Sequence, residues 1–401
     1  MVEWKKIEDL GIYFGGLTGK TKEDFEEGNG KFITYMNVYS NPSLNPSLVG
    51  VVKINEGEKQ NKVQRGDILF TGSSETPEET GMSCVVTDDL EGDFYMNSFC
   101  FGLRLFNPEQ YNLHYFKHLL RSESVRRSIA KTSSGVTRFN ISKARFGKII
   151  IPIPPLSEQT RIVGILDTFT SSIENLKQQI AERRKQYEHY RDQLLDLEGK
   201  EGVEVKTLES LCDLVTKQTG FDYSKTIKPS LTIEKNKDSI PFIQNKDFEG
   251  TRINLNTDFY IPLSVAQNFP KILLNDKIIL ISISGRIGNV GLYDVESVSF
   301  VGGAVCVCRL KSKTNGRYLL YFLLSKKGQN ALFQSVKAAS HANITVEDIR
   351  KIIIPVPSPQ EQSRIVSILD TFEASIQNLE AQLKEREKQY EYYRNQLLTF
   401  E

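Results

Sequence analysis

Two short segments carry residue types at spacings that could bind a phosphate or a metal ion. The first is FGGLTGKT at Phe14–Thr21, which ends in the Gly-Lys-Thr of a phosphate-binding loop. Such a loop needs a glycine five residues before Gly19 and an apolar strand in front of it. This chain has Phe14 at that position and no clear strand before it. The segment therefore argues against an ATP site.

The second segment places His114 and His118 four residues apart, as in a helical zinc site. Tyr115 replaces the glutamate of the HExxH motif, and no third ligand is evident. Both residues are therefore interpreted as surface or core histidines. The four histidines of the chain leave few candidates for general base catalysis, and neither a nucleophile elbow nor a dinucleotide fingerprint is found. The sequence thus predicts a chain that is not an enzyme and holds no cofactor or metal of its own.

Length and composition set the class of protein. A chain of 401 residues is too long for one ordinary core and predicts at least two domains. The contents of hydrophobic residues, 39%, and charged residues, 25%, are typical of soluble globular proteins. No long apolar run or export leader is found, and the five cysteines are interpreted as reduced thiols. These features predict a cytoplasmic protein.

The net charge of +1 conceals two basic stretches. Residues 117–148 contain nine Lys and Arg against one acid, and residues 309–351 contain nine against two. Either stretch could be an ordinary solvated helix face. Their recurrence at corresponding places favours binding of a polyanion, because neutralising phosphates releases counterions.

Both basic stretches precede a long internal repeat. Residues Ile149–Glu198 and Ile352–Glu401 align without gaps and share about 32 of 50 positions. Each copy begins with a β-branched run that predicts a strand ending at proline, continues through a proline-rich corner, and then predicts a long helix. Ser157 is a candidate N-cap of the first helix.

Apolar residues in each helix alternate at spacings of three and four over about five heptads, which predicts a coiled-coil seam. Arg183 and Arg386 are the polar seam positions. Exposing such a seam would forfeit roughly 1.5–3 kcal/mol for each large apolar side chain. We expect the two helices to pair with each other, antiparallel, by the logic of a two-fold interface. Homodimerisation through each helix is the alternative.

The regions before the two helices begin alike and then diverge, although their coarse order stays parallel. Each has an apolar strand, a small-residue loop, a further strand, an amphipathic helix and a short signature. The loops are Thr71–Ser74 and Ser282–Gly288, and the signatures are TRFNIS at Thr137–Ser142 and SHANIT at Ser340–Thr345. The pattern predicts mixed α+β domains with a twisted antiparallel sheet. The divergence fits two readers that present different surfaces from one scaffold, and it equally fits plain drift after duplication.

These residues resemble the specificity (S, HsdS-type) subunits of type I restriction–modification systems. The resemblance rests on PIPPLSEQTRIVGILDTF and PVPSPQEQSRIVSILDTF, on the helix ends KQYEHYRDQLL and KQYEYYRNQLL, on LISISGRIGNVGLY and on SHANIT. It covers nearly the whole chain. It implies an α+β fold with two pseudo-two-fold-related target recognition domains joined by two long antiparallel coiled-coil spacer helices. The implied segments are recognition domain 1 at 1–148, the first repeated frame with its helix at 149–198, the linker and recognition domain 2 at 199–351, and the second frame at 352–401.

The resemblance also implies a function in phage defence. The chain would be the non-catalytic DNA-binding subunit, with each domain reading one half-site of an asymmetric bipartite target in double-stranded DNA. Its partners would be two methyltransferase (M) subunits and the restriction (R) subunits. S-adenosylmethionine for DNA methylation would belong to M, and ATP and Mg to R.

Site residues follow from the resemblance together with the small-residue loops and short signatures. We expect DNA contacts from Ser73, Ser74, Lys131, Arg138, Asn140 and Lys143, and from Ser284, Arg286, Lys326, Lys337, His341 and Asn343. The lysines would contact phosphates, and the others suit base edges. A turn or helix cap is the alternative role for any of these polar residues. The first loop, TGSSETPEETG, is acidic, unlike its counterpart. M-subunit contacts are expected from Glu158, Gln159 and Arg161, with Glu361, Gln362 and Arg364 as their equivalents.

Two other function classes compete with this interpretation. A coiled-coil scaffold that binds only proteins would share the helices but would not need the basic stretches. An enzyme with its own hydrolytic or transferase site is disfavoured by the missing catalytic motifs.

Overall fold

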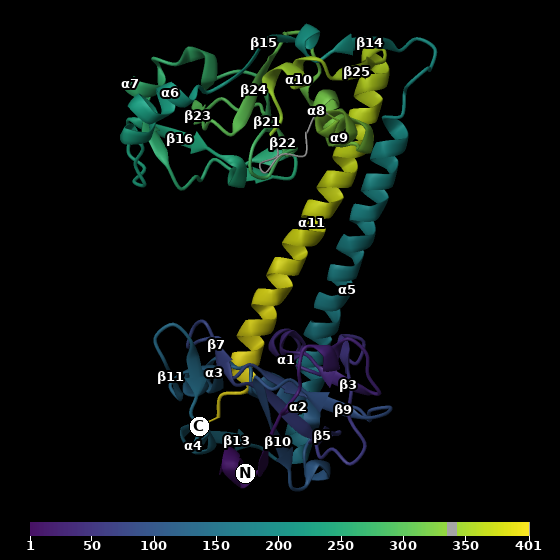
Figure 1. Cartoon of the computed structure of the whole chain (residues 1–401), viewed down its shortest axis with the longest axis vertical. Coiled ribbons are helices and arrows are strands. Elements are labelled where there is room, and N and C mark those ends of the chain that lie inside the picture. The colour runs from purple at the N-terminus through teal and green to yellow at the C-terminus, as the bar shows by residue number, and fades with distance from the viewer. Residues whose placement is uncertain (335–342, 401) are drawn as a thin grey trace. The chain divides into compact units, whose positions relative to one another are not determined.

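The computed structural model describes residues 1–334 and 343–400, which form two compact units (Figure 1). Unit 1 comprises Met1–Gln178 with Glu380–Glu401, and unit 2 comprises Gln179–Leu379. The two units therefore each contain part of both long helices, α5 (Leu156–Leu194) and α11 (Pro359–Leu397). The sequence predicted instead that each helix lies within a single segment, 149–198 or 352–401. The described helices contain no stretch long and apolar enough to cross a membrane.

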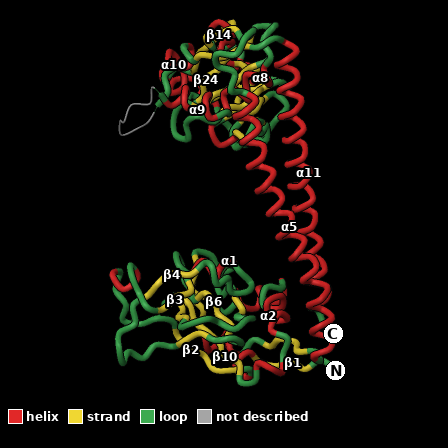
Figure 2. The backbone as a smooth tube through the Cα atoms, turned by 90° about the vertical axis from the view of Figure 1, so that its right-hand side faces the viewer, coloured by secondary structure: helices red, strands yellow, loops and turns green. Residues whose placement is uncertain are grey.

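Besides its parts of α5 and α11, unit 1 consists of short strands and short helices (Figure 2). Its sheets, in strand order, are β1 (Glu3–Lys6) with β13 (Ile150–Ile153); β2 (Gly11–Gly15), β10 (Cys100–Leu105), β6 (Asp67–Thr71) and β8 (Ser83–Val85); β4 (Val49–Val52), β3 (Gly30–Ile33), β9 (Phe94–Met96) and β5 (Lys62–Val63); and β11 (Ser133–Ser134), β12 (Phe139–Ile141) and β7 (Ser73–Ser74). Its short α-helices are α1 (Tyr35–Ser40), α2 (Leu113–Leu119), α3 (Glu123–Ala130) and α4 (Lys143–Gly147).

Unit 2 repeats much of this topology. Its sheets, in strand order, are β14 (Glu204–Thr207) with β25 (Ile353–Val356); β15 (Cys212–Lys217), β24 (Val305–Leu310), β21 (Ile278–Ser282) and β22 (Val290–Tyr293); β19 (Tyr260–Pro262), β16 (Ser239–Ile243), β23 (Ser299–Val301) and β20 (Leu273–Leu274); and β17 (Phe248–Glu249) with β18 (Arg252–Ile253). Its short α-helices are α6 (Gly220–Asp222), α7 (Leu263–Ala266), α8 (Gly316–Leu324), α9 (Lys326–Phe333) and α10 (Val346–Arg350).

The expectation of a single antiparallel sheet in each domain is wrong. Both domains have a second four-stranded sheet, and in both that sheet contains a parallel pair, β3 with β9 and β16 with β23. The partner strands are far apart in the sequence, and each is only three to five residues long. Such brief strands carry no period that would reveal their partners or direction. The two domains therefore share a topology that their divergent sequences conceal.

The core of each domain is continuous with the start of its own long helix. In unit 1 the rings of Phe70, Phe101 and Phe146 pack together with centroids 4.9–5.4 Å apart, and Ile162 and Leu166 of α5 join the same cluster. In unit 2 Ile365 and Leu369 of α11 join the corresponding cluster.

A tyrosine fixes the proline corner in both domains. Tyr115 Oη donates to the carbonyl of Pro152 at 3.0 Å, and Tyr318 Oη donates to the carbonyl of Pro355 at 2.5 Å. Both tyrosines are buried, and burial raises the pKa of each hydroxyl. Because a buried polar group must be hydrogen-bonded to be tolerated, these bonds lock the domain onto the strand that leads into the helix.

The two long helices contact each other within each unit and run antiparallel there. In unit 1 Phe169 stacks on Tyr393 with centroids 5.3 Å apart, and Lys177 pairs with Glu387 at 3.4 Å. In unit 2 Phe372 stacks on Tyr190 at 5.4 Å.

The polar seam residues lie at these aromatic contacts. The guanidinium of Arg386 lies 5.7 Å from the Phe169 ring centroid, and that of Arg183 lies 6.0 Å from the Phe372 ring centroid. Each arginine thus covers the aromatic ring of the opposite helix, an arrangement that a cation–π interaction stabilises. This contact explains why an arginine occupies an otherwise apolar seam in both copies.

Candidate nucleic-acid interface

In the first domain, the loop and the signature singled out from the sequence form one small sheet. Strand β12 pairs with β7 so that Asn140 lies opposite Ser73. Arg138 Nε donates to Ser73 Oγ at 3.2 Å, and its guanidinium lies 5.4 Å from the ring centroid of the exposed Phe99. Arg138 and Asn140 are exposed. The structure therefore presents a guanidinium whose orientation is already restricted, beside an amide.

The expectation that Ser73 and Ser74 project toward a ligand differs from what the structure shows. Their relative exposures are 5% and 8%, and Ser74 Oγ donates to Glu79 Oε2 at 3.2 Å. Both serines form β7, an edge strand of this three-stranded sheet, and β7 pairs with the central strand β12. They support Arg138 and do not reach outward themselves.

The acidic loop after β7 is held by arginines from the basic stretch. Arg126 donates to the carbonyls of Glu78, Thr80 and Gly81 at 2.5–2.7 Å. Arg121 likewise donates to backbone carbonyls of the domain interior. Burial lowers the pKa of each guanidinium to about 10. These two arginines of the stretch are therefore structural.

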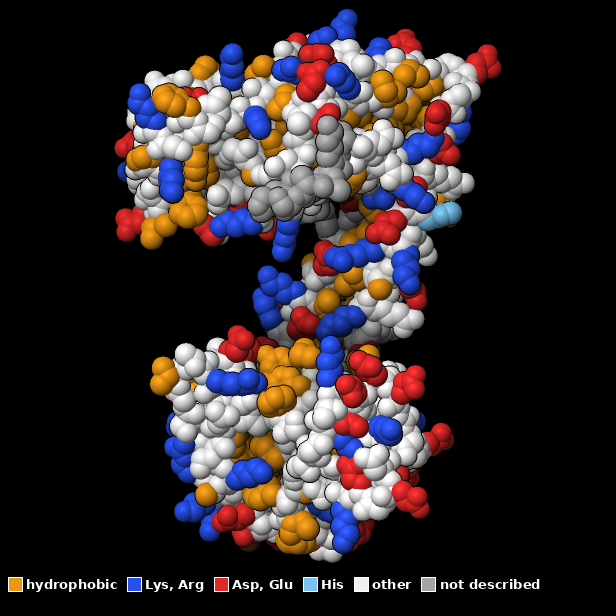
Figure 3. Space-filling model, in the orientation of Figure 1, with side chains coloured by type: hydrophobic (Ala, Val, Ile, Leu, Met, Phe, Trp, Pro, Cys, Tyr) orange, Lys and Arg blue, Asp and Glu red, His pale blue; other side chains and the backbone are white. Residues whose placement is uncertain are grey.

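Three other basic residues of this stretch are more accessible. Lys131, Lys143 and Arg145 are exposed on and around α3 and α4. On the face shown in Figure 3, Lys and Arg side chains are interspersed with Asp and Glu. The basic character is thus local, in agreement with the small net charge.

In the second domain, the same two sequence features also meet. Ser284 forms an isolated bridge with Asn343, whereas Ser73 pairs with Asn140 within the ladder of β7 and β12. Asn245 Nδ2 donates to the Ser284 carbonyl, and Arg286 is exposed in the turn between Gly285 and Gly288, whose positive φ angles of 73° and 86° suit glycine.

Among the lysines predicted in the second domain, Lys326 is exposed at the start of α9, and its backbone N–H donates to Asp192 at 3.0 Å. Lys337 and His341 lie outside the described residues.

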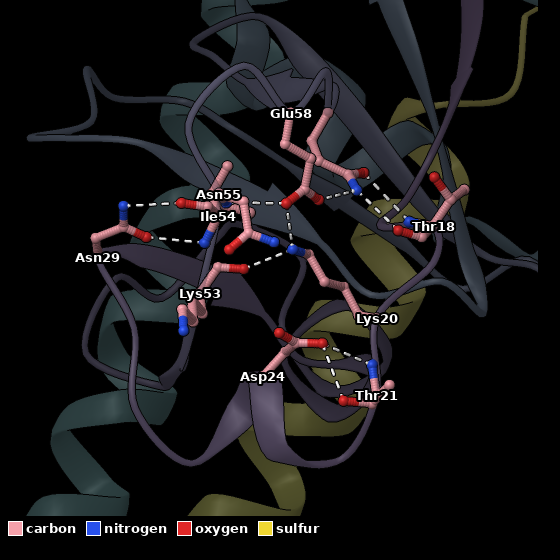
Figure 4. A network of polar contacts seen from close by, with 10 residues as sticks. Thr18, Lys20, Thr21, Asp24, Asn29, Lys53, Ile54, Asn55 and Glu58 are labelled. Carbon is pink, nitrogen blue, oxygen red and sulfur yellow. Dashed lines mark hydrogen bonds and ion pairs between the residues drawn. The ribbon is translucent and has the colours of Figure 1, made fainter.

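The segment Phe14–Thr21, which resembles a phosphate-binding loop, makes structural contacts within the first domain (Figure 4). Lys20 Nζ lies 2.6 Å from Glu58 Oε2 and donates to the Lys53 carbonyl at 2.6 Å, and its side chain is only 5% exposed. Thr21 donates to Asp24 through its N–H and its hydroxyl. The hydrogen bond from Lys20 lowers the pKa of Glu58 to about 2. The lysine and threonine of this segment therefore tie its loop to neighbouring loops.

His114 and His118 lie where the first domain contacts the long helices. His118 is fully buried, with Nε2 2.7 Å from Asp167 Oδ1 and Nδ1 2.9 Å from the hydroxyl of Tyr390. His114 lies farther out, with Nδ1 3.9 Å from Asp167 Oδ2. The described residues contain no group of three or more His, Cys, Asp or Glu side chains placed to hold a metal ion. His118 instead links its domain to both long helices.

This histidine predicts an acid-sensitive contact. Burial lowers the pKa of His118 despite the hydrogen bond to Asp167. Below its ordinary pKa of about 6.5, the unfolded chain therefore binds a proton more readily than the folded chain, so stability is full above that pH and falls as the pH decreases. Burial alone would raise the pKa of Asp167, but hydrogen bonds from His118 and Lys117 lower it to about 2. Its contribution is lost only in the separate window below about pH 4.

The repeat provides the matched variant. The position equivalent to His118 is Tyr321, whose hydroxyl donates to Asp370 at 2.6 Å. We expect the melting temperature of wild type to fall between pH 7.5 and pH 5 by more than that of His118→Tyr, measured by circular dichroism. Equal slopes for the two proteins would contradict the assignment.

Comparison of the sequence with models of known protein families identifies the family of this chain. A family model described as the type I restriction modification DNA specificity domain matches residues 1–183 and matches again at residues 200–387. The chain belongs to this family. The two matches correspond to the two domains of similar topology, each with part of its following helix.

Individual members of the type I specificity family are also similar to this chain. A putative type I restriction enzyme specificity subunit of Haemophilus influenzae is 30% identical over 286 residues, which cover 67% of this chain and 68% of that protein. The EcoR124I/EcoR124II specificity subunit of Escherichia coli is 32% identical over 269 residues and 63% of each chain, so this chain spans less than two thirds of that relative.

The fold is shared as well. A solved structure described as the structural basis of complex assembly and conformational transition of the type I R-M system has a TM-score of 0.61 at 17% identity, and the match covers 99% of this chain and 97% of that one. At this identity the likeness concerns the fold alone.

The predicted partner residues of this specificity-family chain divide into two kinds. Glu158 with Arg161, and Glu361 with Arg364, form paired hydrogen bonds of 2.7–2.8 Å in the first turn of each long helix, and both arginines are exposed. Gln159 is buried, accepts from the Asn112 N–H and donates to the Pro154 carbonyl.

Gln362 likewise donates to the Pro357 carbonyl and is half-buried. The structure thus uses both glutamines to hold the proline corner, and the burial of Gln159 conflicts with a direct partner contact at that residue.

Proposed function

We propose that this chain is the non-catalytic DNA-reading subunit of a type I restriction–modification complex, with one half-site of an asymmetric bipartite target read by each domain. The observation that carries this proposal is the repeated pairing of Ser73 with Asn140 and of Ser284 with Asn343. In both domains the small-residue loop therefore meets the short signature, which supports a DNA-reading surface at corresponding places.

Different side chains surround that point in the two domains. In the first, the restrained Arg138 suits bidentate contact with guanine. In the second, the exposed Asn343 lies beside Asn245 and Ser284, and amides suit adenine. Two domains that read different bases from one scaffold specify two unequal half-sites.

We infer that α5 and α11 act as the spacer between the half-sites. Each is a single helix of 39 residues, and in each unit it packs antiparallel against the other. A helical spacer of fixed length would keep the length of unread DNA constant.

The methyltransferase partner would dock on the repeated frame. The strand ladder β1–β13 exposes Trp4 and Ile150, and the ladder β14–β25 exposes Val205 and Ile353. Exposed apolar side chains at the same place in both domains, beside the ion pairs that open each long helix, suit two copies of one partner. S-adenosylmethionine would then enter with the M subunits, and ATP and Mg with the R subunits.

The test is DNA binding by the chain reconstituted with its cognate M subunit. We expect two M copies per chain and an affinity for duplex DNA whose logarithm falls linearly with the logarithm of salt concentration, because phosphate contacts release counterions. The M subunit alone is the control. A complex that forms but binds duplex no better than M alone would contradict DNA reading and favour a protein scaffold.

A further inference from the structure

The second domain contains a cavity that the candidate interface does not use. It has a volume of about 640 Å³ and lies where β15 ends, between the segment 217–223, the end of β16 and the turn at Gly302–Gly303. The lining residues used below are Lys217, Gln218, Tyr223, Phe242 and Gln244. A cavity of this size is in the range of small-ligand sites.

The side chain of Gln218 makes this cavity chemically unusual. Gln218 is 3% exposed, and neither its Oε1 nor its Nε2 has a hydrogen-bond partner among the described residues. A buried amide left without partners is costly, so native structures rarely keep one unless something else fulfils its hydrogen bonds. Gly303 lies beside this amide; a Cβ there would be in ordinary van der Waals contact with Gln218 Oε1, at 3.4 Å.

The other walls suit a flat aromatic ligand. Tyr223 supplies partly exposed aromatic surface, the buried ring of Phe242 closes another wall, and Lys217 is exposed at the rim, where it could meet a phosphate. Gln244, which also lines the cavity, is followed by Asn245, whose Nδ2 donates to the carbonyl of Ser284. The cavity is therefore joined through one residue to the Ser284–Asn343 pairing.

The first domain has no equivalent side chain. Gly16 follows the last paired residue of β2, as Gln218 follows the last residue of β15. A Cβ on Gly16 would lie 2.1 Å from the carbonyl oxygen of Asn97, so the backbone itself closes this place. The cavity with its amide is thus a feature in which the two otherwise parallel domains differ.

We propose that this cavity, the Gln218 pocket, binds an adenine ring. A carboxamide presents one acceptor and one donor side by side, and adenine offers the matching N6 amino donor and N7 acceptor. The aromatic walls would hold the ring faces, and Lys217 would lie toward the phosphate. The adenine could be a base extruded from the half-site read by the second domain, which rests on the proposed function, or that of a free nucleotide, which does not.

The first arm of the test uses deoxyadenosine monophosphate with the full-length chain. Saturation-transfer NMR should show contact with the adenine protons of dAMP, and dGMP, dCMP and dTMP should give at least threefold weaker signals. Gln218→Leu keeps the volume and removes the amide, so the dAMP signal should disappear. Gln267→Ala, at an exposed position of the same domain, is the control and should leave it unchanged.

The melting temperature separates binding from a structural role. Because the Gln218 amide has no hydrogen-bond partner among residues 1–334 and 343–400, Gln218→Leu should melt at the same temperature as wild type or higher. A clear fall in melting temperature would show that the amide supports the fold and would overturn the proposal.

The second arm uses the complex with its M subunit to select duplexes from a random pool. Wild type should enrich a two-part motif, and Gln218→Leu should lose an adenine preference in one half-site only, with the other half-site unchanged. Loss of the dAMP signal without this change would assign the pocket to a free nucleotide. If no two-part motif is enriched, the proposed function fails while the dAMP arm still decides the pocket. If neither dAMP contact nor adenine preference depends on Gln218, the proposal is wrong.

Discussion

Replacing Leu166 with alanine is expected to lower the free energy of unfolding of unit 1 by about 2–5 kcal/mol. The side chain is fully buried at the point where α5 enters the core of the first domain. The substitution removes apolar contacts and leaves a cavity between the domain and its helix, and such sites collapse only partly. Chemical denaturation followed by circular dichroism measures the change.

The internal repeat supplies matched controls for this prediction. Leu369, the equivalent residue, is equally buried in unit 2, so Leu369→Ala should destabilise unit 2 by a similar amount. Leu156, at the start of α5, is 49% exposed, and Leu156→Ala should change stability by less than about 0.5 kcal/mol. If Leu166→Ala and Leu156→Ala cost the same, the helix does not belong to the core of the first domain.

The second large effect is expected at Arg126. Arg126→Ala removes a buried guanidinium that serves three backbone carbonyls of the loop between β7 and β8. Leaving these acceptors without partners should cost about 3 kcal/mol in the free energy of unfolding. Because this loop follows Ser73, which positions Arg138, the change should also weaken DNA reading by the first domain.

The neighbouring residue is the control for Arg126. Arg127 is exposed and its ion pair in the described part of the chain is with Glu123, one turn away, so Arg127→Ala should change stability by less than about 1 kcal/mol. The same two variants can be compared by duplex selection in the complex with M. Equal losses for Arg126→Ala and Arg127→Ala would show that the buried hydrogen bonds to the loop carry no special weight.

The duplicated frame is where sequence reasoning was most effective. An apolar repeat with spacings of three and four residues belongs to a helix that packs along one face, and the structure pairs the two helices within each unit. The polar seam positions Arg183 and Arg386 were visible in the sequence. Their partners, Phe372 and Phe169, follow only from the antiparallel register.

Features that depend on distant contacts were not predictable. The pairing of β3 with β9 joins strands about 60 residues apart, and neither has a pattern that names its partner. The meeting of Ser73 with Asn140 was predicted as two separate candidates, whereas their pairing, and the burial of the serine, required the fold. Gln218 stands out only because the surrounding backbone leaves its amide without partners.

We propose above that this chain specifies where DNA is methylated. The most direct measurement maps methylated adenines across the genome of a host that expresses the chain with its cognate M subunit, and compares it with a host that expresses M alone. We expect the methylated adenines to define a new asymmetric motif of two unequal parts separated by a constant gap. Unchanged methylation in cells where the complex has formed would contradict it.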